Sequence, residues 1–225
     1  MTRVPLRRGA ATLAALALAA PASAATVSSF GDITFLEIFE ATLADGGENV
    51  DPADAVAVEL DPEFADASAE VTTTGPGLAT ASDLTVVEGR FTNLLDEPID
   101  FLVGYITSYA LEIDLVAPGE SAEAIFDAQF LVDGEFLGFD GDEARAVFGG
   151  PGCFGSGSCN VFVDDANGTI FGVRLEAGET APVQLIAAAE VSAVAPVPLP
   201  AALGPAALGV AALAWLGRRG GRRRA

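Results

Sequence analysis

Apolar and polar residues alternate with a period of two along much of this chain. Residues Leu111 to Leu115 alternate apolar with acidic side chains, the pattern of a strand with one buried face. Other short apolar stretches lie between turn residues, and no stretch there has a convincing amphipathic helical pattern. About nine short strands predict an all-β fold, an antiparallel β-sandwich. The further predicted strands are Ile33 to Leu43, Ala55 to Leu60, Ala69 to Thr74, Asp83 to Asn93, Phe101 to Ser108, Ala122 to Val132, Val161 to Asp164, Thr169 to Leu175 and Pro182 to Val194.

Turn residues support this division. Asp165-Ala166-Asn167-Gly168 separates two apolar stretches, and because Asn-Gly readily adopts the positive φ of a type I′ turn, it predicts the best hairpin of the chain. Two other turns, at residues 115–122 and 175–181, resemble each other. Residues 136–150 are ambiguous, and Asp142 to Phe148 is compatible with one or two helical turns.

Both ends of the chain are apolar for reasons unrelated to a core. Residues 1–24 begin with Arg3, Arg7 and Arg8, continue with an apolar stretch and end in Ala22-Ser23-Ala24. This order predicts a secretory signal peptide that signal peptidase cleaves after Ala24. The pair Arg7-Arg8 raises the twin-arginine route, but the small residues after it favour the general route. Residues 25–195 then form the predicted sandwich domain.

The C-terminal end, residues 196–225, combines an apolar run with a basic tail. Ala201 to Leu216 is 16 apolar residues, about 24 Å as a helix and just long enough to cross the inner membrane if flanking residues are drawn in. Positive charge stays on the cytoplasmic side, so the body is predicted to face outward. The basic residues are Arg218, Arg219, Arg222, Arg223 and Arg224.

A short proline-containing motif precedes this apolar segment. Val197-Pro198-Leu199-Pro200-Ala201, the apolar segment and the arginine cluster together resemble the VPLPA variant of the PEP-CTERM sorting signal of Gram-negative bacteria. The resemblance implies recognition of the motif by an exosortase-type membrane protease, and release or transfer of the body to the cell surface or extracellular matrix. It implies a transient anchor at 202–216 and a stop-transfer tail of arginines. A permanent single-span anchor is the alternative, and the tail carries no information on what the body does.

Charge and composition narrow the chemistry of the body. All 32 acids but only Arg90, Arg145 and Arg174 lie in it, so its net charge is 3 − 32 = −29. Nucleic acid and anionic lipid are therefore excluded as partners. The chain has no His and no Lys, which excludes histidine-based catalysis, ordinary zinc sites, Schiff bases and a P-loop. A non-enzymatic protein is predicted, and a carboxylate-only glycosidase is a remote alternative.

Two residue groups outside the tail are candidate sites. Cys153 and Cys159 lie in a glycine-rich loop, and after export they are predicted to form a disulfide, because five intervening residues do not make a redox motif. Acidic clusters on predicted loops could ligate calcium, although neither fits an EF-hand. The candidate calcium ligands are Asp140, Asp142, Glu143, Asp164 and Asp165.

These observations predict an exported structural or weakly interacting protein of the cell surface or extracellular matrix, without a cofactor. The first alternative is a calcium-dependent module that binds acidic exopolysaccharide, with the metal bridging two negative surfaces. Solvated acidic loops explain the same clusters.

Overall fold

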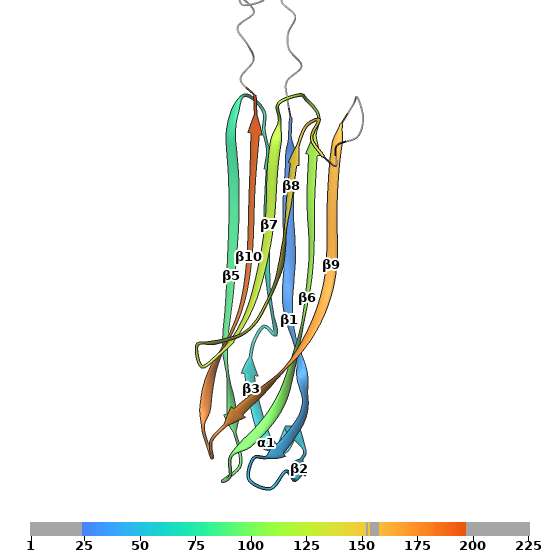
Figure 1. Cartoon of the computed structure of the whole chain (residues 1–225). Coiled ribbons are helices and arrows are strands. Elements are labelled where there is room, and N and C mark those ends of the chain that lie inside the picture. The colour runs from blue at the N-terminus through green and yellow to red at the C-terminus, as the bar shows by residue number, and fades with distance from the viewer. Residues whose placement is uncertain (1–23, 152, 154–157, 197–225) are drawn as a thin grey trace, which may run out of the picture. The chain divides into compact units, whose positions relative to one another are not determined.

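The computed structural model describes residues 24–151, 153 and 158–196, which fold into two antiparallel five-stranded sheets packed face to face (Figure 1). The predicted β-sandwich is confirmed, with ten strands in this part of the chain where about nine were expected. Sheet A contains β1 (Thr26–Leu43), β2 (Asn49–Val50), β4 (Phe64–Thr72), β6 (Ile99–Leu115) and β9 (Cys159–Leu175). Sheet B contains β3 (Val56–Leu60), β5 (Gly77–Asn93), β7 (Ser121–Val132), β8 (Glu135–Val147) and β10 (Thr180–Ala195), and a short helix, α1 (Pro52–Ala55), precedes β3.

The order of strands in each sheet determines which edge strands of the two sheets lie near each other. Sheet A runs β2-β1-β6-β9, with β4 also paired to β1, and sheet B runs β3-β5-β10-β7-β8. The two edge strands β8 and β9 lie near each other on one side of the sandwich. On the other side β4 lies beside β5, and the Ser68 N–H of β4 donates to Asp83 Oδ2 of β5 at 3.0 Å. The two sheets therefore approach each other along both margins.

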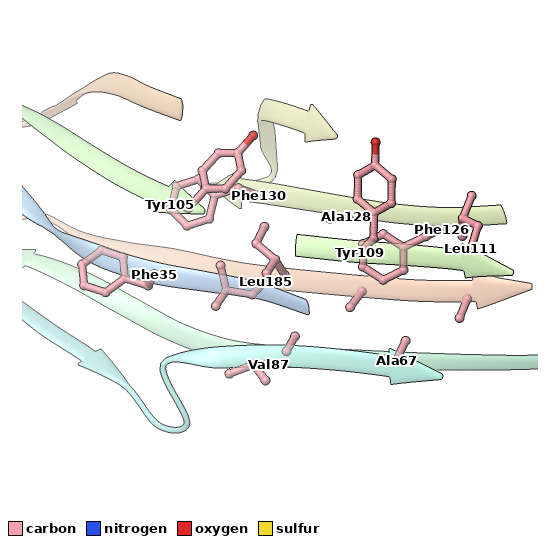
Figure 2. Close-up of a cluster of buried hydrophobic side chains, with 14 of the residues drawn as sticks. Phe35, Ala67, Val87, Tyr105, Tyr109, Leu111, Phe126, Ala128, Phe130 and Leu185 are labelled. Atoms are coloured by element: carbon pink, nitrogen blue, oxygen red, sulfur yellow. The ribbon is translucent and has the colours of Figure 1, made fainter. Parts of the chain in front are cut away.

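The core follows the alternation of the sequence. In β7 every second residue, from Ala122 to Val132, is buried, and β10 shows the same pattern. Small residues face large ones, as interdigitating layers require (Figure 2). Phe126 packs over Gly31, where an added Cβ would lie 2.6 Å from the ring atom Cζ. Aromatic contacts such as Tyr109–Phe126, with centroids 5.7 Å apart, then fill the space between the sheets.

The strands are longer than the sequence predicted, and the hairpin prediction is wrong. Residues 165–168 continue β9 without interruption, because β6 is one strand and offers a partner to each of them, Tyr109 to Asp165 through Ile106 to Gly168. The two-residue turn lies instead at Asp133-Gly134, between β7 and β8, where φ is 51° and 75°. An Asx-Gly pair permits positive φ, but strand pairing decides which pair adopts it.

The helical interpretation of Asp142 to Phe148 is also wrong. Residues up to Val147 belong to β8 and pair with β7 through Ser121. Ala144 and Ala146 are buried while their neighbours are exposed, which is the two-residue period of a strand. Here the alternation is carried by alanines, whose small apolar side chains give a weak signal.

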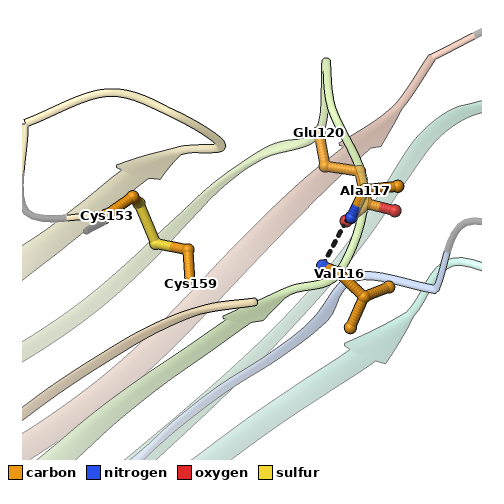
Figure 3. Close-up of a disulfide and its surroundings, with 5 residues drawn as sticks. All are labelled: Val116, Ala117, Glu120, Cys153 and Cys159. Atoms are coloured by element: carbon orange, nitrogen blue, oxygen red, sulfur yellow. Dashed lines mark hydrogen bonds between the residues drawn. A yellow bond between two sulfur atoms is a disulfide. The ribbon is translucent and has the colours of Figure 1, made fainter. Parts of the chain in front are cut away.

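The two similar turns found in the sequence have the same design. Each ends with a glutamate after a glycine of positive φ, Gly119 at 89° and Gly178 at 65°. The Glu120 carboxylate accepts the backbone N–H groups of Val116 and Ala117, at 2.7 and 2.9 Å (Figure 3). The Glu179 carboxylate accepts the N–H of Glu176 at 2.6 Å. Each side chain thus closes its own turn, at β6–β7 and at β9–β10.

Among the described residues no helix has the length and apolar character needed to cross a membrane. The predicted signal peptide and the predicted C-terminal helix, motif and arginine cluster lie outside those residues, apart from Ala24 and Pro196.

Candidate functional site

Three of the five predicted calcium ligands face the margin between β8 and β9. Asp140 and Asp142 are on the inward face of β8, since they pair with the buried Ala128 and Phe126 of β7. Asp165 lies on the inward face of β9, opposite the buried Tyr109. We call Thr107, Tyr109, Asp140, Asp142 and Asp165 the acidic seam.

Hydrogen bonds order this seam from both sheets. The buried Thr107 hydroxyl of β6 donates to Asp140 Oδ2 and also lies 3.3 Å from the carbonyl oxygen of Asn167. Asn167 Nδ2 donates to Asp165 Oδ2 at 3.0 Å. Thr107 therefore links an edge strand of sheet B to an edge strand of sheet A.

The pKa values of Tyr109, in the seam, and of Tyr105, nearby on β6, are both raised by their surroundings. Burial raises the pKa of Tyr109 above its ordinary value, and the charges of Asp142, Asp140 and Asp165 raise it further. Burial also raises the pKa of Tyr105, opposed by a hydrogen bond with Thr169 and reinforced by Asp140. Because a phenolate would face both desolvation and negative charge, neither hydroxyl is set up as a base or nucleophile at neutral pH.

The other two predicted ligands point elsewhere. Glu143 lies on the outer face of sheet B and forms an ion pair with Arg145, which also donates to Glu123 at 2.8 Å. Asp164 lies on the outer face of sheet A, opposite Ala110 of β6. Successive residues of a strand face opposite sides, so a continuous β9 separates Asp164 from Asp165. The sequence had placed these pairs on loops, where neighbours can converge.

Asp164 instead borders a shallow depression of about 660 Å³ on the outer face of sheet A. Asp32 and Asp66 line it with the exposed ring of Phe30. Asp32 is held by the Ser108 hydroxyl, which donates to Oδ2 at 2.8 Å. The sequence analysis missed Asp32 and Asp66, because only the β4–β1 register places them side by side.

Within residues 24–151, 153 and 158–196, no three carboxylate or thiolate side chains converge closely enough to hold a metal ion. The seam and the depression together present carboxylates, hydroxyl groups and the exposed aromatic ring of Phe30. Such groups can accept hydrogen bonds from hydroxylated ligands or attract cationic ones.

The disulfide prediction is confirmed. Cys153 and Cys159 are bonded to each other, and the bond lies near the β6–β7 turn that Glu120 closes (Figure 3). Cys159 begins β9, and Cys153 lies in the loop between β8 and β9. The bond therefore ties the start of β9 to this loop. The sorting residues 197–201 and the arginines 218–224 lie outside the described residues.

Comparison with family models, with characterised proteins and with solved structures found no match to this chain. The chemistry of the body must therefore be inferred from its own residues.

Proposed function

We propose that this protein is exported, processed at its C-terminal tail by an exosortase-type membrane protease, and acts at the cell surface or in the extracellular matrix as a non-enzymatic structural or weakly interacting protein. The observation that carries the proposal is the order of motif, apolar segment and arginine cluster at residues 197–225. The Cys153–Cys159 disulfide supports it, since disulfides persist in oxidising compartments.

The described body suits such a role. Its interior is filled by interlocking side chains, and the outer-face depression is an open surface rather than an enclosed cavity. A net charge of −29, mostly on the exposed faces, keeps a matrix protein soluble and repels anionic polymers in the absence of cations.

The test is the intact mass of the protein recovered from cell-surface and culture-medium fractions of the exporting host. A chain that starts near Ala25 and ends near Val197 supports both processing events, and any excess mass identifies an attached group. A matched variant with Pro198→Ala and Pro200→Ala should keep the full tail and stay in the inner-membrane fraction. Processed protein found only in the cytoplasm, or normal processing of the variant, would contradict the proposal.

The calcium-dependent exopolysaccharide module stays a prediction. The described carboxylates do not converge on a metal site, so Asp140, Asp142 and Asp165 of the acidic seam would have to move together to ligate the ion. If calcium binds there, a chelator should lower the melting temperature of the native protein, and Asp140→Asn should abolish that sensitivity. The carboxylate-only glycosidase also stays a prediction, which requires turnover of a matrix polysaccharide.

A further inference from the structure

Strand β9 is a long free edge. It is 17 residues long and pairs with β6 from Cys159 to Leu175 without a register shift. Among the described strands none pairs with its other side, and Figure 1 shows β9 in orange at the margin of its sheet. Backbone N–H and C=O groups along such an edge are a template for another strand.

The other edges are short, irregular or covered. β2 and β3 have two and five residues. β8 has a register shift beside Leu131, and Asp140 and Asp142 accept the N–H groups of the residues that follow them. β4 and the free part of β5 are tied to each other through Ser68 and Asp83. Such features protect edges from pairing. Within β9 there is no bulge and no proline, and the one bond of this kind, from the Ala166 N–H to Asp165 Oδ1 at 2.8 Å, has to be exchanged for an inter-strand bond when the edge pairs.

The sequence of β9 is self-complementary about Ala166. Residues equally distant from it match in character: Asp165 with Asn167, Val163 with Thr169, and Phe162 with Ile170. A two-fold axis through Ala166 would therefore place these residues opposite suitable partners in an identical antiparallel strand, with Asp164 opposite Gly168. The Asp165–Asn167 pair would join a carboxylate to an amide donor, and Phe162–Ile170 would join an aromatic to a β-branched side chain.

Other registers are worse. Opposed residues must be separated by an even number for their side chains to share a face, so the neighbouring choices are centred on Asp164, Asp165 or Asn167. The first two oppose identical carboxylates across the axis. The third puts Asp164 opposite Ile170 and Phe162 opposite Gly172. The centres at Ala166 and Asn167 both avoid opposed like charges, and of these two only Ala166 pairs the two large apolar side chains.

The surface is open for such pairing. Phe162 and Ile170 are each 56% exposed, and all residues from Asp164 to Ile170 are exposed on both faces of the strand. We propose that this protein forms a symmetric dimer in which β9 pairs antiparallel with β9 of a second copy, centred on Ala166. Sheet A then continues across the axis, and the exposed Phe162 and Ile170 side chains of the two copies cover each other.

Charge makes this dimer dependent on salt. Each body carries a net charge of −29, and the two Asp165 side chains lie diagonal to each other across the axis. Raising NaCl from about 0.1 M to about 1 M shortens the screening length from about 10 Å to about 3 Å. The dimer is therefore favoured at high salt, the opposite of an association driven by complementary charge.

Sedimentation velocity of the exported protein at both salt concentrations tests the proposal. The dimer fraction should rise with salt, and Ala166→Asp should weaken the dimer about a hundredfold by opposing two carboxylates on the axis. Thr80→Asp is the matched control, since Thr80 is exposed on β5 of sheet B and the charge change is equal. A monomer at both salt concentrations, or equal weakening by the two substitutions, would overturn the proposal.

A second variant maps the axis without disturbing the pairing. Ala166→Cys should give a linked dimer with a short thiol cross-linker, and Thr80→Cys should not. Equal cross-linking of the two variants would also refute the β9 interface. The dimer goes beyond the proposed function, and the experiments separate the two: mass and fractionation report where the chain goes, whereas sedimentation and cross-linking report its pairing wherever it is found.

Discussion

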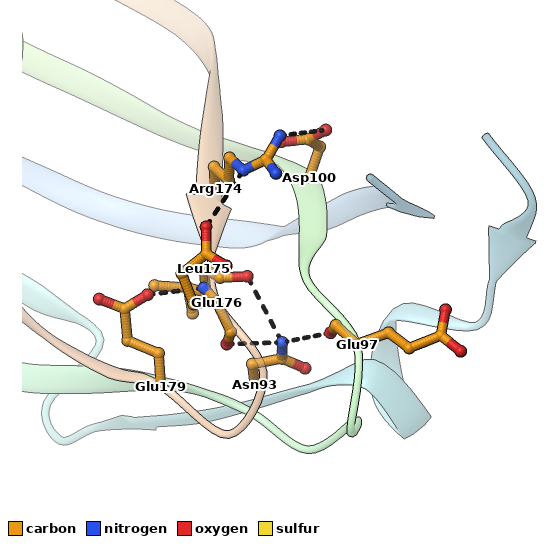
Figure 4. Close-up of polar contacts among 7 residues, drawn as sticks. All are labelled: Asn93, Glu97, Asp100, Arg174, Leu175, Glu176 and Glu179. Atoms are coloured by element: carbon orange, nitrogen blue, oxygen red, sulfur yellow. Dashed lines mark hydrogen bonds and ion pairs between the residues drawn. The ribbon is translucent and has the colours of Figure 1, made fainter. Parts of the chain in front are cut away.

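The buried amide of Asn93 donates from Nδ2 to the carbonyl oxygen of Glu176 at 2.9 Å, and so joins the end of β5 to the β9–β10 turn (Figure 4). The same Nδ2 donates to the carbonyl oxygen of Glu97 at 2.9 Å, and Asn93 Oδ1 accepts the N–H of Leu95 at 2.9 Å. One side chain thus holds the β5–β6 turn and the β9–β10 turn together.

Asn93→Ala should therefore destabilise the protein by about 2–4 kcal/mol, because it leaves several backbone groups at this partly buried site without partners. Urea denaturation would show a lower midpoint with an unchanged m-value. Gln184→Ala is the control, since the Gln184 amide donates to Glu88 at 3.1 Å at an exposed site, and its cost should stay below about 1 kcal/mol. Equal costs would mean that Asn93 does not hold the two turns.

Two glycine substitutions distinguish close packing from turn geometry. A Cβ at Gly31 would lie 2.6 Å from Phe126 Cζ and 2.7 Å from the Ser108 carbonyl oxygen, so Gly31→Ala should cost about 1–3 kcal/mol. At Gly168 the nearest atom to an added Cβ outside the adjoining residues, the Tyr105 carbonyl oxygen, is 3.8 Å away. Gly168→Ala should be neutral or stabilise by up to about 1 kcal/mol.

Thermal denaturation of both variants checks this pair. A domain of this size loses about 2–4 °C of melting temperature per kcal/mol. A large loss for Gly168→Ala would indicate a residue of positive φ, and would restore the hairpin that the sequence predicted at residues 165–168.

The sequence predicted the architecture better than the lengths of its elements. The period of two is a local property, so it was visible at Leu111 to Leu115 and along β7 and β10. The position of the turn is not decided locally. Asn167-Gly168 and Asp133-Gly134 both favour a two-residue hairpin turn, and the pairing of β9 with β6 excludes the first of them.

The candidate site shows the same limit. The sequence singled out Asp140, Asp142 and Asp165 as calcium ligands, which stays a prediction, and the structure places all three on the inward faces of β8 and β9. The sequence also grouped Asp164 and Glu143 with them, because residues adjacent in sequence were expected to converge on loops. In a strand, adjacent side chains point to opposite faces. Thr107, which bonds to Asp140, comes from β6, 33 positions away, and only the register of three strands brings it there.

The two glutamate turns differ in burial and so in their contribution to stability. Glu120 is fully buried and accepts two N–H groups, whereas Glu179 is exposed and accepts one. Glu120→Ala should cost about 2–3 kcal/mol and Glu179→Ala less than about 1 kcal/mol. Glu120→Gln keeps an acceptor oxygen and should fall between these values. Chemical denaturation measures all three, and equal losses at Glu120 and Glu179 would contradict the role given to burial.

Asp127, on the outer face of sheet B, makes stability depend on pH. Burial raises the pKa of Asp127 above its ordinary value of 3.8, and the Glu190 carboxylate on β10 raises it further. Between 3.8 and the raised value the folded state binds more protons than the unfolded state, so this residue's contribution to stability falls as the pH rises through that window. Asp127→Asn should then raise the melting temperature at pH 7, with a gain that shrinks toward zero below pH 3.8. Asp45→Asn, the same charge change in the exposed β1–β2 turn, measures the general relief of repulsion in so acidic a body. A gain no larger than this control, or one that persists at low pH, would show that the charge of Asp127 carries no special cost.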